Sequence, residues 1–128
     1  MSEIDAILDR CCREVPTALG AAIIDVGAAS AVAITSADEA LDLAGMAPAL
    51  SEVARRHRSA LEALGGAPPG QSEDLILTTI RGSLLLHVFG ESEERTYLLV
   101  LAAGRAANPG MARLVLASYE GRLLEALR

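Results

Sequence analysis

Two histidines are the side chains in this chain best suited to general acid–base chemistry or metal binding. His57 falls on the apolar stripe of a predicted helix, and His87 alternates with apolar residues in a predicted strand. Both patterns favour a packed or hydrogen-bonded histidine over a ligand or a base. The two cysteines, Cys11 and Cys12, are adjacent, which strains a disulfide between them and leaves no metal-ligand spacing. We therefore expect structural cysteines.

The acidic residues gather at two places that do not predict a catalytic pair. One group lies at a predicted helix start and the other fills a turn: Asp38, Glu39 and Asp42, then Glu91, Glu93 and Glu94. Acidic residues at a helix start favour the helix dipole, and such runs are usually solvated. The motifs GxxxxGK[ST], GxGxxG, GxSxG and HExxH do not occur in the sequence. We expect no catalytic residue, no cofactor and no metal site, and hence no enzyme.

Length and composition favour one globular domain spanning residues 1–128. Of the 128 residues, 52% are hydrophobic but only 2% are aromatic, so aliphatic side chains must fill the core. The formal net charge is −6, and all 11 basic residues are arginine. Nucleic-acid platforms need stacking aromatics and a basic face, so nucleic acid is excluded as a partner class.

The amino terminus predicts an intracellular protein. The opening MSEIDAILDR carries acidic residues where a secretory signal needs a basic patch and an apolar run. The longest weakly polar run, at residues 18–34, is interrupted by Asp25 and Gly27 and falls short of the ~20 apolar residues of a spanning helix. We expect a cytoplasmic protein without direct membrane insertion.

Periodicity in the first half predicts a helix and a hairpin. Residues 3–14 form an amphipathic pattern that Pro16 ends. The apolar runs 19–25 and 30–35, joined by VGAA, predict two antiparallel strands. Ser36 and Glu39 have the spacing of a capping box, which predicts a helix start near residue 37.

The middle of the chain predicts a second helix. Pro48 fits the first turn of a helix better than its interior, so the main helix is expected from Ala47 to Leu64, ending at Gly65 and Gly66. Its apolar face contains Leu50, Val53, Ala54, His57, Leu61 and Leu64. The segment GGAPPGQSED, residues 65–74, is expected to be a loop.

The second half predicts three strands and a closing helix. Runs 75–80 and 84–89 are rich in β-formers and flank a glycine-containing turn, which is typical of a hairpin, and a further apolar run covers 96–103. Asn108 is a good N-cap with Pro109 at the first helical position. The helix that follows has the apolar stripe Ala112, Leu116, Tyr119, Leu123 and Leu127.

These elements predict an α+β fold with the order αββαβββα. Each of the three helices has an apolar stripe that must be buried against the sheet. A five-stranded, mainly antiparallel sheet can receive all three only if helices cover both of its faces. We expect the middle helix on one face and the first and last helices on the other. Residues 98–101 are continuously apolar, as expected for a strand buried on both faces.

Three stretches resemble the roadblock family of dynein light chains and its bacterial relatives. LVLAAGRAANPGMARLVL resembles the family's last strand and its AN.G.ARL.L approach to the last helix. SEDLILTTIRGSLLLHVFG is similar to the family's central hairpin, and GAAIIDVGA to its first strand. Pro109 stands where family members often have leucine. The resemblance spans nearly the whole chain and implies that the expected sandwich is roadblock/profilin-like.

The resemblance implies a non-catalytic homodimer that serves a Ras-like small GTPase as regulator or platform, through activation of hydrolysis or through localisation. Two copies would pair edge to edge through the third strand and the middle helix, and the client would meet polar residues of that helix. The implied dimer residues are Leu50, Val53, Ala54, His57, Leu61, Leu75, Ile76, Leu77, Thr78, Thr79 and Ile80. The implied partner-binding residues are Glu52, Arg55, Arg56, Arg58 and Glu62.

Two other functions are compatible with the same residues. One is an assembly scaffold of this fold without a GTPase client, and the other is a small-molecule sensor of profilin-like or PAS-like layout, or a small enzyme. A sensor needs a ligand cavity, which a core of small aliphatic residues does not suggest. An edge strand as apolar as LILTTI is an aggregation hazard unless a partner covers it, and this favours self-association.

Overall fold

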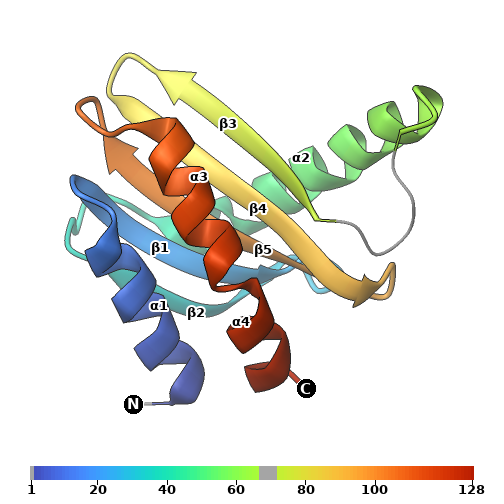
Figure 1. Cartoon of the computed structure of the whole chain (residues 1–128), viewed down its shortest axis with the longest axis horizontal. Coiled ribbons are helices and arrows are strands. Elements are labelled where there is room, and N and C mark those ends of the chain that lie inside the picture. The colour runs from blue at the N-terminus through green and yellow to red at the C-terminus, as the bar shows by residue number, and fades with distance from the viewer. Residues whose placement is uncertain (1, 67–71) are drawn as a thin grey trace.

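A five-stranded antiparallel sheet lies between two helical layers in the computed structural model, which describes residues 2–66 and 72–128 (Figure 1). The strands follow the order β2-β1-β5-β4-β3 across the sheet. The helices are α1 (Glu3–Glu14), α2 (Leu43–Ala63), α3 (Pro109–Ser118) and α4 (Glu120–Ala126). The strands are β1 (Ala18–Asp25), β2 (Ser30–Ser36), β3 (Glu73–Thr79), β4 (Gly82–Ser92) and β5 (Arg95–Gly104).

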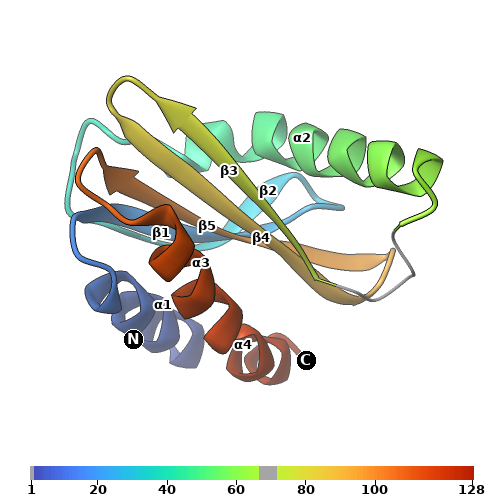
Figure 2. The same cartoon turned by 45° about the horizontal axis from the view of Figure 1, so that its top comes forward.

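Helix α2 covers one face of the sheet, and α1, α3 and α4 cover the other, as Figure 2 shows. This confirms the predicted antiparallel sheet and the division of the helices between its faces. The sequence in the middle of β5 dictates the arrangement, because Leu98, Leu99, Val100 and Leu101 are all fully buried. Side chains alternate between faces along a strand, so two separate cores must receive them.

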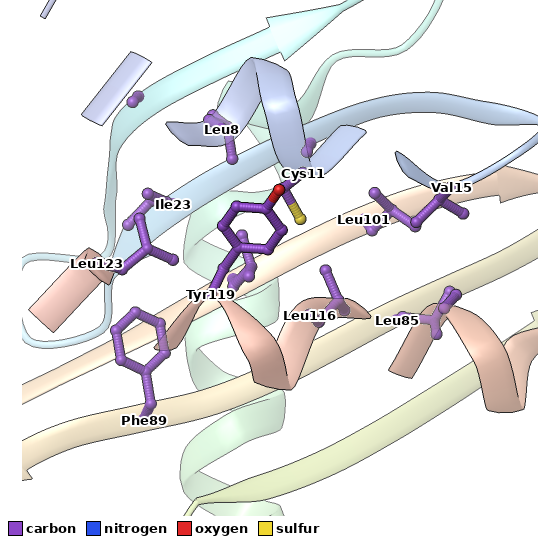
Figure 3. Packing of buried hydrophobic residues seen from close by; sticks show 14 of the residues in the cluster. Leu8, Cys11, Val15, Ile23, Leu85, Phe89, Leu101, Leu116, Tyr119 and Leu123 are labelled. Atoms are coloured by element: carbon purple, nitrogen blue, oxygen red, sulfur yellow. The ribbon is translucent and has the colours of Figure 1, made fainter. Parts of the chain in front are cut away.

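The two cores divide the β5 side chains between them. Leu98 and Val100 pack with the α2 residues Leu43 and Ala47 on one face. On the other face, Leu99 and Leu101 pack with α1, α3 and the buried Tyr119 at the junction of α3 and α4. Figure 3 shows the Tyr119 ring beside Leu8 and Cys11 of α1. The small aliphatic side chains expected from the composition therefore fill both layers.

The start of α2 differs from the prediction. Ser36 does not cap a helix, because its hydroxyl closes a local turn by bonding both the N–H and the carbonyl of Asp38. The helix begins at Leu43, where the Asp42 carboxylate accepts a bond from the N–H of Gly45 at 2.9 Å. Pro48 lies inside the helix at an exposed position, and Ala44, whose carbonyl loses its helical hydrogen-bond partner to the proline, is an exposed residue as well.

The closing segment also differs in detail. The Asn108 cap is confirmed, since its side chain accepts the N–H of Met111 at 3.2 Å. The expected single helix is divided at Tyr119 into α3 and α4. Strand β3 starts at Glu73, earlier than predicted, and Ile80 belongs to the turn that follows it. Of the expected loop, positions 67–71 lie outside the described residues.

Gly82 sits where the backbones of β4 and β5 approach closely. A Cβ at Gly82 would clash with the carbonyl oxygen of Ala103, whereas a Cβ at Gly121 in α4 would meet nothing within 4 Å. We expect Gly82→Ala to lower the free energy of unfolding by about 1–3 kcal/mol through backbone strain. Gly121→Ala should raise it by about 0.5–1 kcal/mol, because alanine is the better helix former. Urea unfolding followed by circular dichroism measures both, and equal effects of the two variants would contradict this account.

Candidate interaction surface on β3 and α2

Strand β3 forms one edge of the sheet, and no other strand of the described residues pairs with its outer side (Figure 1). It pairs with β4 without any register shift, from Glu73 opposite Val88 to Thr79 opposite Gly82. Two residues, Ile80 and Arg81, connect the strands, so Thr79 and Gly82 are the hydrogen-bonded pair that closes the hairpin. Hydrogen-bonded and non-hydrogen-bonded pairs alternate along an antiparallel ladder. Thr78 therefore belongs to a non-hydrogen-bonded pair, and its backbone N–H and C=O face the free edge.

The opposite edge is less suited to pairing with another strand. In β2 the register with β1 shifts between Ile23 and Ile24, which leaves Val32 as an extra residue without an opposite partner. Such a bulge twists an edge and discourages strand addition. The predicted pairing strand is thus the regular edge of this sheet, uncharged from Leu75 onward, and β2 is the bulged one.

The expected dimer residues divide into surface and core. Strand β3 leaves Leu75 and Leu77 half-buried toward α2, whereas Ile76, Thr78, Thr79 and Ile80 are exposed. On α2, the half-buried residues are Val53, His57 and Leu61.

Leu50 and Ala54 do not belong to this surface. Their side chains are 5% and 3% exposed in the α2 core of this chain, out of reach of a second copy. The middle of the predicted apolar stripe packs on the sheet of the same chain. Only its flank, formed by Val53, His57 and Leu61, is available to a partner.

The five polar residues expected to bind a partner have different surroundings. Arg55 donates from Nη2 to the carbonyl of Val26 at 2.7 Å, which ties α2 to the end of β1. Arg58 is 20% exposed and lies 3.6 Å, Nη1 to Oε1, from the buried carboxylate of Glu73. Both guanidinium groups therefore hold the fold together.

Glu52, Arg56 and Glu62 lie on the outer surface of α2. Arg56 is 82% exposed, and its Nε donates to Glu52 Oε1 at 2.9 Å. This hydrogen bond to Arg56 holds the pKa of Glu52 below its usual value. Glu62 is exposed one turn beyond Arg58. A partner approaching α2 from outside would meet these charged groups first.

His87 is a hydrogen-bonded core histidine, as its alternation in the strand predicted. It is 2% exposed in β4, with Nδ1 2.7 Å from Asp74 Oδ1 and Nε2 2.8 Å from Glu120 Oε1. Ser72 also bonds Glu120, and Arg113 lies 3.6 Å from Asp74. The cluster joins β3, β4 and the two last helices.

His57 makes the corresponding contact on the other face. Its Nδ1 lies 3.2 Å from Oε2 of Glu73, which is 8% exposed. Sequence reasoning assigned Glu73 and Asp74 to a loop and Glu120 to no role. The sequence did contain a signal, since Glu73 and Asp74 directly precede an apolar run. If they begin the strand, their side chains point to opposite faces of the sheet and can each meet a different helical layer.

The two cysteines, one cavity and possible metal ligands are the remaining candidates for chemistry. Both cysteines are free thiols, and burial raises the pKa of Cys11 to about 12. A cavity of about 310 Å³ lies under the second half of α2, but Arg55 and Arg58, which line it, are engaged by Val26 and Glu73. Among residues 2–66 and 72–128, no group of His, Cys, Asp and Glu is arranged to hold a metal ion.

The four helices within the described part of the chain lack the combination of length and apolar character needed to cross a bilayer.

Solved structures similar to this chain share its whole fold. MglB of Myxococcus xanthus superposes with a TM-score of 0.76 at 14% identity, over 99% of this chain and 96% of that one. The gliding protein MglB of Thermus thermophilus gives 0.74 at 22% identity, over 96% and 87%. A roadblock/LC7 domain of Streptomyces avermitilis gives 0.67 at 19% identity, over 95% and 98%.

The sequence itself matches no protein-family model and no curated protein. Because the sequence identities to these structures are only 14%, 19% and 22%, the similarity establishes the arrangement of helices and strands alone. That arrangement agrees with the three stretches that resemble the roadblock family, and the chain has the roadblock/LC7 fold.

Proposed function

We propose that this chain, as a single domain over residues 1–128, forms a cytoplasmic homodimer that regulates or positions a Ras-like small GTPase without catalysing a reaction itself. The observation that carries the proposal is the regular edge of β3 beside the half-buried apolar flank of α2, in a chain of the roadblock/LC7 fold. The fold also occurs in MglC of Myxococcus xanthus, with a TM-score of 0.54 at 23% identity over 91% of this chain and 92% of that one.

The edge of β3 and α2 would form the dimer together. Antiparallel pairing of two β3 strands about a two-fold axis continues the sheet and keeps the same face of both copies on one side. The two α2 helices then lie on that face, beside the half-buried Leu75 and Leu77. Pairing would cover the exposed Ile76 and satisfy the outward amide of Thr78.

The outer surface of the two α2 helices would receive the client. Glu52, Arg56 and Glu62 supply a charged rim, and Arg pairs well with carboxylates at such interfaces. Arg58 is largely buried against Glu73, and Arg55, although 48% exposed, is held by the carbonyl of Val26, so we assign no arginine finger. An effect on hydrolysis would come from holding the client's own switch segments in a competent arrangement.

Thr78→Pro tests the dimer. The substitution removes an N–H that faces the free edge while leaving the bonds of β3 to β4 in place, so we expect a folded monomer at micromolar concentration. Thr78→Ala keeps the N–H and should remain dimeric, as should the wild type. Light scattering after size exclusion measures the mass, and a wild-type monomer or a dimeric Thr78→Pro variant would contradict the pairing.

Arg56→Glu tests the client surface. Because Arg56 is 82% exposed and bonds only Glu52 among the described residues, its reversal should leave the fold intact. We expect about tenfold weaker binding of a Ras-like GTPase from the same genome in its GTP-bound form. Arg10→Glu, an equal charge change on α1, is the matched control and should bind as the wild type does.

Pull-down and GTP-hydrolysis assays with each such GTPase provide the measurement. Absence of nucleotide-dependent binding by the wild type would favour a scaffold of the same fold without a GTPase client. Binding that Arg56→Glu leaves unchanged would place the docking surface elsewhere on the molecule.

A further inference from the structure

We infer that Glu73 is a positioning residue that couples the β3 edge to α2, while its neighbour Asp74 ties the same strand to the opposite helical layer. This inference rests on the proposed function where it concerns dimerisation, because it says how the two parts of the proposed interface are held in register. The coupling itself is a property of the single chain.

Glu73 reaches α2 through both carboxylate oxygens. Oε2 lies 3.2 Å from Nδ1 of His57, and Oε1 lies 3.6 Å from Nη1 of Arg58. The Glu73 side chain is 7% exposed, so water screens these contacts weakly. His57 and Arg58 are adjacent residues in the second half of α2, and the carboxylate therefore fixes the position of that half along the edge strand.

Asp74 points to the other face, as the alternation of a strand requires. Its Oδ1 bonds the buried His87 of β4, and its Oδ2 lies 3.6 Å from Nη1 of Arg113 in α3. His87 in turn bonds Glu120 of α4. One end of β3 is thus attached to both helical layers by two adjacent carboxylates.

Beyond these two carboxylates, the described residues of β3 make no further polar contact with either helical layer, although Leu75 and Leu77 pack toward α2. From Leu75 onward the strand carries apolar and hydroxyl side chains, and Ile76 remains 41% exposed. The polar contacts at Glu73 therefore act together with the packing of Leu75 and Leu77 to set the position of the free edge relative to α2. A shift of α2 would move the edge with it, which would couple binding on α2 to dimerisation at β3.

Hydrogen exchange of the full chain tests this coupling without a GTPase client. Glu73→Gln keeps the shape of the side chain and removes its charge. We expect exchange about tenfold faster or more in β3 and in the second half of α2, residues 55–63, with α3 and α4 unchanged. Asp74→Asn should speed exchange in β3 and in residues 109–126 instead, leaving α2 unchanged.

His57→Gln removes the α2 side of the contact without altering β3. If Glu73 acts through His57, this variant should also speed exchange in β3. The free-energy change of local opening in the double variant with Glu73→Gln should then be smaller than the sum of the changes in the two single variants. Glu91→Gln, which breaks the exposed pair with Arg128, is the control and should change neither region. Identical patterns for Glu73→Gln and Asp74→Asn, or a His57→Gln effect confined to α2, would overturn the inference.

The dimer dissociation constant supplies the second measurement. We expect Glu73→Gln to raise it about tenfold while far-UV circular dichroism stays unchanged, and Glu91→Gln to leave it as it is. A wild-type monomer would refute the proposed dimer but leave the exchange pattern as a valid test of the coupling. A wild-type dimer with unaltered exchange in Glu73→Gln would refute the coupling and leave the proposed function standing.

Discussion

Burial of β5 on both faces is the constraint on which the rest of this structure depends. Four consecutive residues, Leu98 to Leu101, are fully buried, and their alternation sends two side chains into each of two cores. A single helical layer would leave half of them in water, at a cost of about 1.5–3 kcal/mol for each large side chain. The chain therefore places α2 on one face and the other three helices on the opposite face (Figure 2).

Two covered faces leave the edges of the sheet as the places where backbone groups are unpaired. The bulge at Val32 interrupts β2, whereas β3 keeps a regular register along its whole length. Adjacent carboxylates at the start of β3 attach it to both layers, so its edge is presented in a fixed position. A firmly held, unprotected edge suits pairing with a second strand better than it suits a monomer in water.

The polar residues of the chain gain their roles from this architecture. His57 and His87, the side chains best suited to chemistry, each bond a carboxylate of β3. Arg55 and Arg58 hold α2 in place, and Arg56 is left on the surface. These arrangements fit a binding platform, in which rigidity matters more than a reactive group.

The sequence by itself determined the elements and their order, because strand alternation, helical stripes and caps such as Asn108 are local properties. It also predicted packed or hydrogen-bonded histidines: His87 is buried in the core, and His57 is half-buried and bonds Glu73. It placed the start of the main helix at Ala47, because Pro48 fits a first turn better than a helix interior, whereas the helix begins at Leu43 with Asp42 as its cap. Only the tertiary structure decided which α2 residues are free, that Glu73 and Asp74 serve opposite faces, and that Glu120 meets His87, because these contacts join residues 13 to 33 positions apart.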